Sequence, residues 1–104
     1  MSQGGAATPP PLEPAERLAA AVLAVPGVAA LHPGMFGEVG TYLPGRRVAG
    51  IRVADHAVDV HIIVVFGVAV RDTAAAVRAT VGRLHPGAEV NVTVEDVAPA
   101  AGAR

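Results

Sequence analysis

Asp59 and His61 are the residues of this chain whose types and spacing could support chemistry. Two positions apart in an extended strand, their side chains share one face, where a carboxylate and an imidazole can bind a metal ion or move a proton. Catalysis needs a further positioned group in a pocket, and the sequence offers no third one. The competing interpretation pairs Asp59 with Arg52 and leaves His61 as a solvated surface residue. We favour this interpretation and predict neither a catalytic residue nor a metal site.

Nucleophilic side chains are almost absent. The chain has no cysteine and no lysine, its single serine is Ser2, and its threonines stand in no motif with a base. No P-loop, HExxH, CxxC or GxSxG motif occurs. We therefore predict a non-enzymatic protein without a cofactor.

Gly34-Met-Phe-Gly37 matches the GxxG loop with which K-homology domains clamp an RNA backbone. That loop joins two helices and carries basic residues, whereas here it follows an expected strand and precedes Glu38. Arg71 and Arg78 share one side of an expected helix, which is also the pattern of a solvated helix face. A formal net charge of −1 gives no general attraction to nucleic acid. Nucleic-acid binding therefore stays the alternative function, and a protein partner is preferred.

The strand that carries Asp59 and His61 organises the chain. Residues 58–66 alternate with period 2 and are rich in β-branched side chains, which is typical of a half-buried strand. A tight turn at Asp55-His56 lets residues 48–53 fold back on it as a β-hairpin. The register that gathers the large apolar side chains on one face pairs Val53 with Val58, Ile51 with Val60 and Ala49 with Ile62. It also sets Arg52 opposite Asp59.

Two helices and two further strands are expected around this hairpin. A helix over 14–25 opens with proline and carries an apolar stripe of Leu18, Ala21, Val22 and Val25. A helix over 70–85 carries a stripe of Val70, Ala74, Val77, Val81 and Leu84. Residues 28–31 form a short strand, and residues 89–95 form an alternating one with Val90, Val92 and Val94 inward.

The resulting α-β-β-β-α-β order predicts an α+β fold, a two-layer sandwich with two helices on one face of a three- or four-stranded mixed sheet. Residues 1–14 are a Pro/Gly-rich segment that we expect to be disordered, 15–97 form a single domain, and 98–104 form a frayed tail. A domain of this size buries only roughly 60–65% of the surface that its unfolded chain exposes, and is marginally stable alone. We therefore expect association into a homo-oligomer.

Four residues are candidate protein contacts. The long loop 32–45 holds four glycines, two prolines and both Phe36 and Tyr42. Phe36 could instead tuck under the helices as core. Ile63 and Val65 are expected on the face of the sheet away from the helices, either as the apolar background of a valine-rich strand or as a contact for a partner.

Several motifs follow one another in a characteristic order: Val25-Pro-Gly-Val-Ala-Ala-Leu31, the loop with Gly34 and Gly37, Phe66-Gly67, and Val90-Asn-Val-Thr-Val-Glu-Asp-Val97. Across residues 15–97 this order resembles the alkaline shock protein family of bacterial envelope stress response proteins. The resemblance implies a non-enzymatic cytoplasmic protein that serves cell-envelope homeostasis and self-associates. It also implies a possible small membrane-anchored protein partner at the inner face of the membrane. The proline-rich start departs from the family pattern, which opens with a strand-like segment.

The hydropathy pattern bears on where the protein resides. No apolar run reaches the roughly 18 residues of a membrane-spanning helix, and the longest, 62–70, is half of that. The N-terminus lacks the basic and apolar regions of a signal peptide. We therefore expect a cytoplasmic protein without direct membrane insertion.

Overall fold

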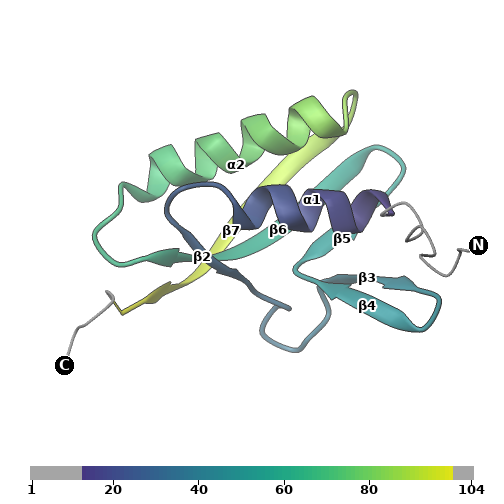
Figure 1. Cartoon of the computed structure of the whole chain (residues 1–104), viewed down its shortest axis with the longest axis horizontal. Helices are drawn as coiled ribbons and strands as arrows, with labels where there is room; N and C mark the ends of the chain where they lie inside the picture. Colours follow the sequence, from purple (N-terminus) through teal and green to yellow (C-terminus); the bar gives the residue numbers. More distant parts are fainter. Residues whose placement is uncertain (1–12, 100–104) are drawn as a thin grey trace, which may run out of the picture.

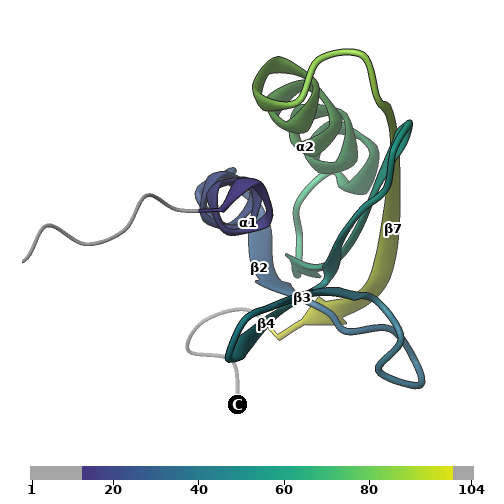
Figure 2. The same cartoon turned by 90° about the vertical axis from the view of Figure 1, so that its right-hand side faces the viewer.

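The computed structural model describes residues 13–99, which form two layers (Figure 1). The elements in chain order are α1 (Pro14–Leu23), β2 (Val28–Leu31), β3 (Gly40–Leu43), β4 (Arg46–Ala49), β5 (Ile51–Val53), β6 (Ala57–Val65), α2 (Val70–Leu84) and β7 (Glu89–Ala98). Both helices lie on one side of the sheet (Figure 2). The predicted α+β sandwich is confirmed. The terminal segments 1–12 and 100–104 lie outside the described residues, and Pro14 and Ala98, assigned to the tails, belong to α1 and β7.

The central strand β6 has β7 along one edge and two shorter strands along the other. β7 is parallel to it over its whole length. On the opposite edge, β5 pairs with the first half of β6 and β2 with the second half, both antiparallel. The sheet is therefore mixed and four-stranded, as predicted, and the register of Val53 with Val58, Ile51 with Val60 and Arg52 with Asp59 is confirmed.

The change from β5 to β2 occurs at His61. Its amide donates to the carbonyl of Gly50 (2.9 Å), and its own carbonyl accepts from the amide of His32 (2.9 Å). Gly50 has φ +84°, and a Cβ there would lie 2.7 Å from the Cβ of Leu31. Glycine is required at this crossing because an L side chain would be strained and would clash.

This crossing overturns part of the predicted hairpin. The strand expected over 48–53 is interrupted at Gly50, so Ala49 pairs with Gly40 and Ile62 pairs with Leu31 instead. The loop expected over 32–45 consequently contains β3, which forms a two-stranded sheet with β4 (Figure 1). The alternation of apolar residues continued through Gly50, so it could not reveal that the backbone turns away there.

The core lies between the sheet and the helices. Every second residue of β6 is fully buried on this side, as the alternation predicted. The largest fully buried side chains are Leu18, Val22, Val39, Ile51, Val58, Val60, Ile62, Val64, Val77 and Val81. Burial of each contributes about 1.5–3 kcal/mol relative to an exposed side chain.

The buried side of α2 differs from the predicted stripe. Its buried residues are Thr73, Val77 and Val81, whereas Val70 is 40% and Leu84 50% exposed. Thr73 is buried where α2 approaches the chain between α1 and β2, and a Cβ on Gly27 would lie 2.6 Å from its Oγ1. The buried part of the stripe is therefore confined to the middle of the helix, and both ends of the expected stripe are left at the surface.

Candidate protein-contact surface

Asp59 lies on the helix-free face of the sheet, in the half formed by the first residues of β6, and its carboxylate is fully engaged. Arg52 donates from Nε (3.1 Å) and Nη2 (2.9 Å) to Oδ2, and the Asn91 side chain donates to Oδ1 (3.0 Å). Burial raises the pKa of Asp59, but the hydrogen bonds from Asn91 and Arg52 outweigh it and leave the pKa below its usual value. The predicted ion pair is confirmed.

His61 lies on the same face, and the prediction that it is a solvated residue is wrong. Its Nδ1 lies 2.6 Å from Oε2 of Glu95, and the two side chains are only 17% and 19% exposed. The register between β6 and β7 shifts after Ile62, so β7 has an extra residue at this point, and that residue is Glu95. Sequence reasoning missed Glu95 because an even alternation gives no sign of a bulge.

The polar half of the face therefore holds two separate groups, Asp59 with Arg52 and Asn91, and His61 with Glu95. Among residues 13–99, no three His, Asp or Glu side chains lie close enough to hold a metal ion. Asp59 and His61 share the face as expected from their spacing, but each is bound to a different partner. Their arrangement fixes the strands relative to one another.

The other half of the helix-free face is mostly apolar, with the exposed Asp96 at its β7 edge. Ile63 and Val65 are half-buried and alternate with the fully buried core residues of β6, so they point away from the helices as predicted. Ile63 lies in register with Ala30 of β2 and Asp96 of β7, and Val65 lies in register with Ala98. We call Ala30, Ile63, Val65 and Ala98 the apolar patch.

The loop between β2 and β3 projects from the side of the sheet opposite the helices, at the lower right of Figure 2. Met35 and Phe36 at its tip are 79% and 88% exposed, so the interpretation of Phe36 as core is wrong. Sequence analysis did not single out Met35, although its place beside Phe36 in a glycine-rich loop was the available signal.

Hydrogen bonds hold this exposed tip in one conformation. The Gly34 amide donates to Nδ1 of His32 (2.9 Å), the Phe36 amide donates to Oε1 of Glu38 (2.9 Å), and the Gly37 amide donates to the Gly34 carbonyl (3.1 Å). The amide of Glu38 itself and that of Phe36 lower the pKa of the Glu38 carboxyl, and the charges of His61 and Arg52 lower it further. The loop is thus built to present its two large apolar side chains to solvent.

Arg47 connects this loop to Tyr42. Its Nη2 donates to the Gly37 carbonyl (2.6 Å), and its guanidinium carbon lies 5.2 Å from the centre of the Tyr42 ring. Gly40 makes room for this arrangement, because a Cβ there would lie 2.5 Å from the guanidinium. Tyr42 is 79% exposed. Arg47 therefore contacts both the Tyr42 ring and the loop that carries Phe36, whereas Ile63 and Val65 belong to the sheet.

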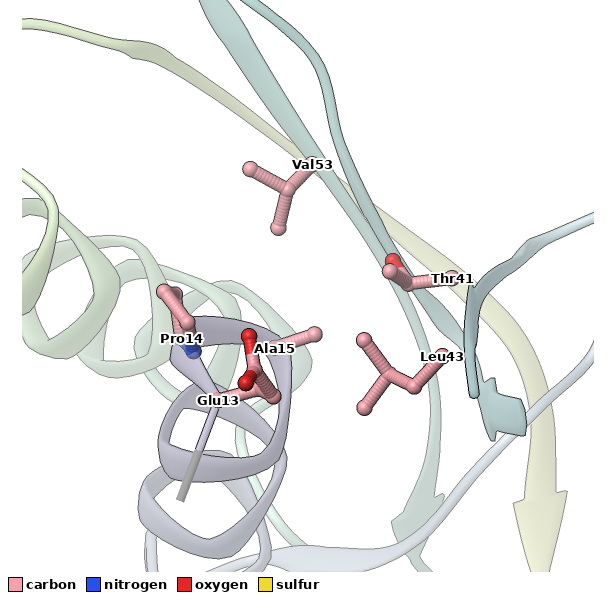
Figure 3. Close-up of a pocket in the computed structure, with 6 residues that line it drawn as sticks. All are labelled: Glu13, Pro14, Ala15, Thr41, Leu43 and Val53. Carbon is pink, nitrogen blue, oxygen red and sulfur yellow. The ribbon is translucent and has the colours of Figure 1, made fainter. Parts of the chain in front are cut away.

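A small hollow lies between the start of α1 and strands β3 and β5. It has a volume of about 190 Å³ and is lined by Glu13, Pro14, Ala15, Thr41, Leu43 and Val53. The side chains of Ala15, Leu43 and Val53 point toward one another across it (Figure 3). The Thr41 hydroxyl donates to the Ile51 carbonyl (2.6 Å), so the wall is apolar apart from Glu13. We call it the α1 pocket.

An ion pair fixes the helix end that forms this pocket. Arg46 donates to Glu16 from Nε (2.6 Å) and Nη2 (3.0 Å), and the Glu13 amide donates to Oε1 of Glu16 (3.0 Å). The hydrogen bonds from Arg46, followed by that from Glu13, lower the pKa of Glu16 to about 2. The pocket joins residues 13–15 to residues 41–53, a relation that no local sequence pattern reports.

Comparisons with known proteins return no match: no family model, no curated protein and no solved structure is significantly similar to the chain. Among residues 13–99, neither helix has the length and apolar character needed to cross a lipid bilayer.

Proposed function

We propose that this protein is a non-enzymatic adaptor that binds other protein chains, including further copies of itself, near the cell envelope. The observation that carries the proposal is the apolar patch on the helix-free face. Ile63 and Val65 point away from the core that the helices cover, and a small domain gains stability when such a surface is buried by association. The envelope part rests on the resemblance of the ordered motifs to alkaline shock proteins.

The neighbouring polar half supports a contact of this kind. Asp59 and His61 are already paired with Arg52, Asn91 and Glu95, so a partner can cover this polar half without leaving their charges unpaired. The exposed carboxylate of Asp96 beside Ile63 must then stay in solvent or meet a cation of the partner. One half of the face is then polar and the other mostly apolar, and protein–protein interfaces combine both kinds of surface.

The same contacts argue against the nucleic-acid alternative. The amides of Gly34, Phe36 and Gly37 in the GxxG segment are bonded within the chain, and Glu38 places a carboxylate beside them. A phosphate would have to displace that carboxylate. Binding to RNA that weakens steeply with salt would favour the alternative.

The test of the contact surface is Ile63→Asp, which places a charge in the centre of the apolar patch. We expect the variant to keep its fold by circular dichroism and to lose self-association in size-exclusion chromatography with light scattering. Thr93→Asp is the matched control, because it adds the same charge in the polar half of the face, in register with His61. If Ile63→Asp and the wild type have the same mass at every concentration, the apolar patch is not the interface.

The envelope location has its own test. An epitope-tagged copy is expected to sediment with membranes and to stay there after a salt wash and after nuclease, because its partner is a membrane-anchored protein. Recovery in the supernatant of untreated cells would contradict this, and release by nuclease would point to nucleic acid instead.

A further inference from the structure

The α1 pocket and the tip of the β2–β3 loop are two features that the fold leaves unused. The pocket offers an apolar space of about 190 Å³, and the loop offers an aromatic side chain that is 88% exposed. We propose that Phe36 of one copy inserts into the α1 pocket of a second copy and links the chains head to tail. This inference rests on the proposed self-association and specifies a second contact for it.

The size of the pocket suits the side chain. A cavity of about 150 Å³ lined by apolar side chains holds a benzene molecule, so a space of about 190 Å³ can accept the phenyl ring of Phe36. The wall is made of the short side chains of Pro14, Ala15, Leu43 and Val53, which present carbon atoms to the ring (Figure 3).

The loop tip can enter an apolar site at low cost. Residues 33–37 carry no charge. The amides of Gly34, Phe36 and Gly37 already have acceptors within the chain, so their burial leaves no donor unsatisfied. Because the loop is held in one conformation before it docks, little conformational entropy is lost.

Charge and area also bear on the contact. Arg47 donates to the Gly37 carbonyl, Glu38 accepts from the Phe36 amide, and Glu13 stands in the wall of the pocket. Docking therefore brings a cation and a carboxylate of the loop toward Glu13 together, and the contact rests on the fit of the ring to the pocket. An aromatic side chain buries about 150–250 Å². Even if Met35 and the pocket wall double this buried area, the total falls short of the roughly 1,200 Å² that a stable interface buries. The joint is therefore weak and depends on concentration.

The positions of the two features decide the kind of assembly. The loop and α1 lie on opposite sides of the sheet (Figure 2), so a chain cannot fill its own pocket. A contact between two different surfaces is heterologous, and each bound copy offers a further free pocket and a further free loop. The expected products are open chains or rings.

Two variants test this joint by complementation. Phe36→Ala removes the inserting ring but keeps the pocket. Ala15→Leu keeps the ring and fills the pocket, with Leu43→Asp as a second pocket variant should Ala15→Leu fail to fold. Each is followed by analytical ultracentrifugation, alone and in equimolar mixture, with circular dichroism as the control for folding.

The wild type is expected to grow in mass with concentration. Each variant alone should bind itself at least about tenfold more weakly, as for the loss of an interface anchor. When both variants also carry Ile63→Asp, which removes the contact through the apolar patch, their mixture should form a one-to-one dimer and nothing larger, since one ring and one pocket remain to be joined. Association of Phe36→Ala equal to that of the wild type, or a mixture without the dimer, would overturn the joint.

The joint and the proposed function fail in different ways. If Phe36→Ala associates normally and Ile63→Asp does not, the joint is refuted and the apolar patch stands. If the wild type stays a monomer at every concentration, both self-association and the joint are refuted.

Discussion

Replacing two neighbouring loop residues tests which of them belongs to the core. Phe36 is the larger side chain but is 88% exposed, whereas Val39 is only 1% exposed. The sequence alone left open whether Phe36 is a contact or a core residue, and only in the second case would Phe36→Ala be the more damaging change. The structure predicts the opposite order.

The magnitudes follow from burial. Full burial of a phenylalanine contributes at most about 3 kcal/mol. Because Phe36 is 88% exposed, its burial contributes only about a tenth of that. Phe36→Ala therefore lowers the free energy of unfolding by under about 0.5 kcal/mol. Val39→Ala removes two buried carbon atoms at about 0.8 kcal/mol each and leaves a cavity, for a total of about 2–3 kcal/mol. At about 4–8 °C per kcal/mol for a domain of this size, Tm falls by under about 4 °C for Phe36→Ala and by about 8–24 °C for Val39→Ala.

The assay is thermal unfolding of both variants and the wild type, followed by circular dichroism at one low protein concentration so that association does not contribute. Urea unfolding gives the same comparison near 25 °C. A fall in Tm for Phe36→Ala as large as that for Val39→Ala would mean that the ring is buried, and the loop could not be a contact.

Two further predictions concern the backbone crossing and the ion pair at α1. Gly50→Ala should cost at least about 2 kcal/mol in urea unfolding, because left-handed backbone disfavours an L side chain and its Cβ would meet Leu31. Gly67→Ala, with a similar φ but no atom within 4 Å, should cost only about 1 kcal/mol, and equal costs would exclude the clash. The lowered pKa of Glu16 implies stability that is present above about pH 4.5 and lost as the pH falls toward about 2. Glu16→Gln should therefore flatten the acid side of the stability profile, measured by thermal unfolding from pH 6 to 2, and an unchanged slope would contradict the pair with Arg46.

The local patterns of the sequence predicted most of the sheet and both helices. The alternation over 58–66 predicted which side chains of β6 meet the core. The register that gathers the large apolar side chains on one face predicted the pairing of β5, including Arg52 opposite Asp59. These features follow from the period of a strand, which is written in neighbouring residues. Pro14 likewise predicted the start of helix α1, and Pro86-Gly87 predicted the end of helix α2.

The sequence also narrowed the candidate site, because side-chain chemistry is a property of residue types. The lack of cysteine, lysine and motif-bound nucleophiles argued against a catalytic site and in favour of a protein-contact surface. It placed Ile63 and Val65 on the helix-free face by alternation alone. It did not decide whether Phe36 is a contact or a core residue, because a large apolar residue in a loop can be exposed or buried with the same sequence neighbours.

Only the tertiary structure decided the features that depend on distant segments. Gly50 breaks its strand because Leu31 and His32 pass close to it, and Glu95 reaches His61 because β7 has a bulge. The exposure of Phe36 depends on where the β2–β3 loop lies relative to the rest of the fold. The α1 pocket depends on how the start of α1 packs against strands that are distant in the sequence. Periodicity encodes which face of an element is apolar, but contacts between elements are set by the packing of the whole core.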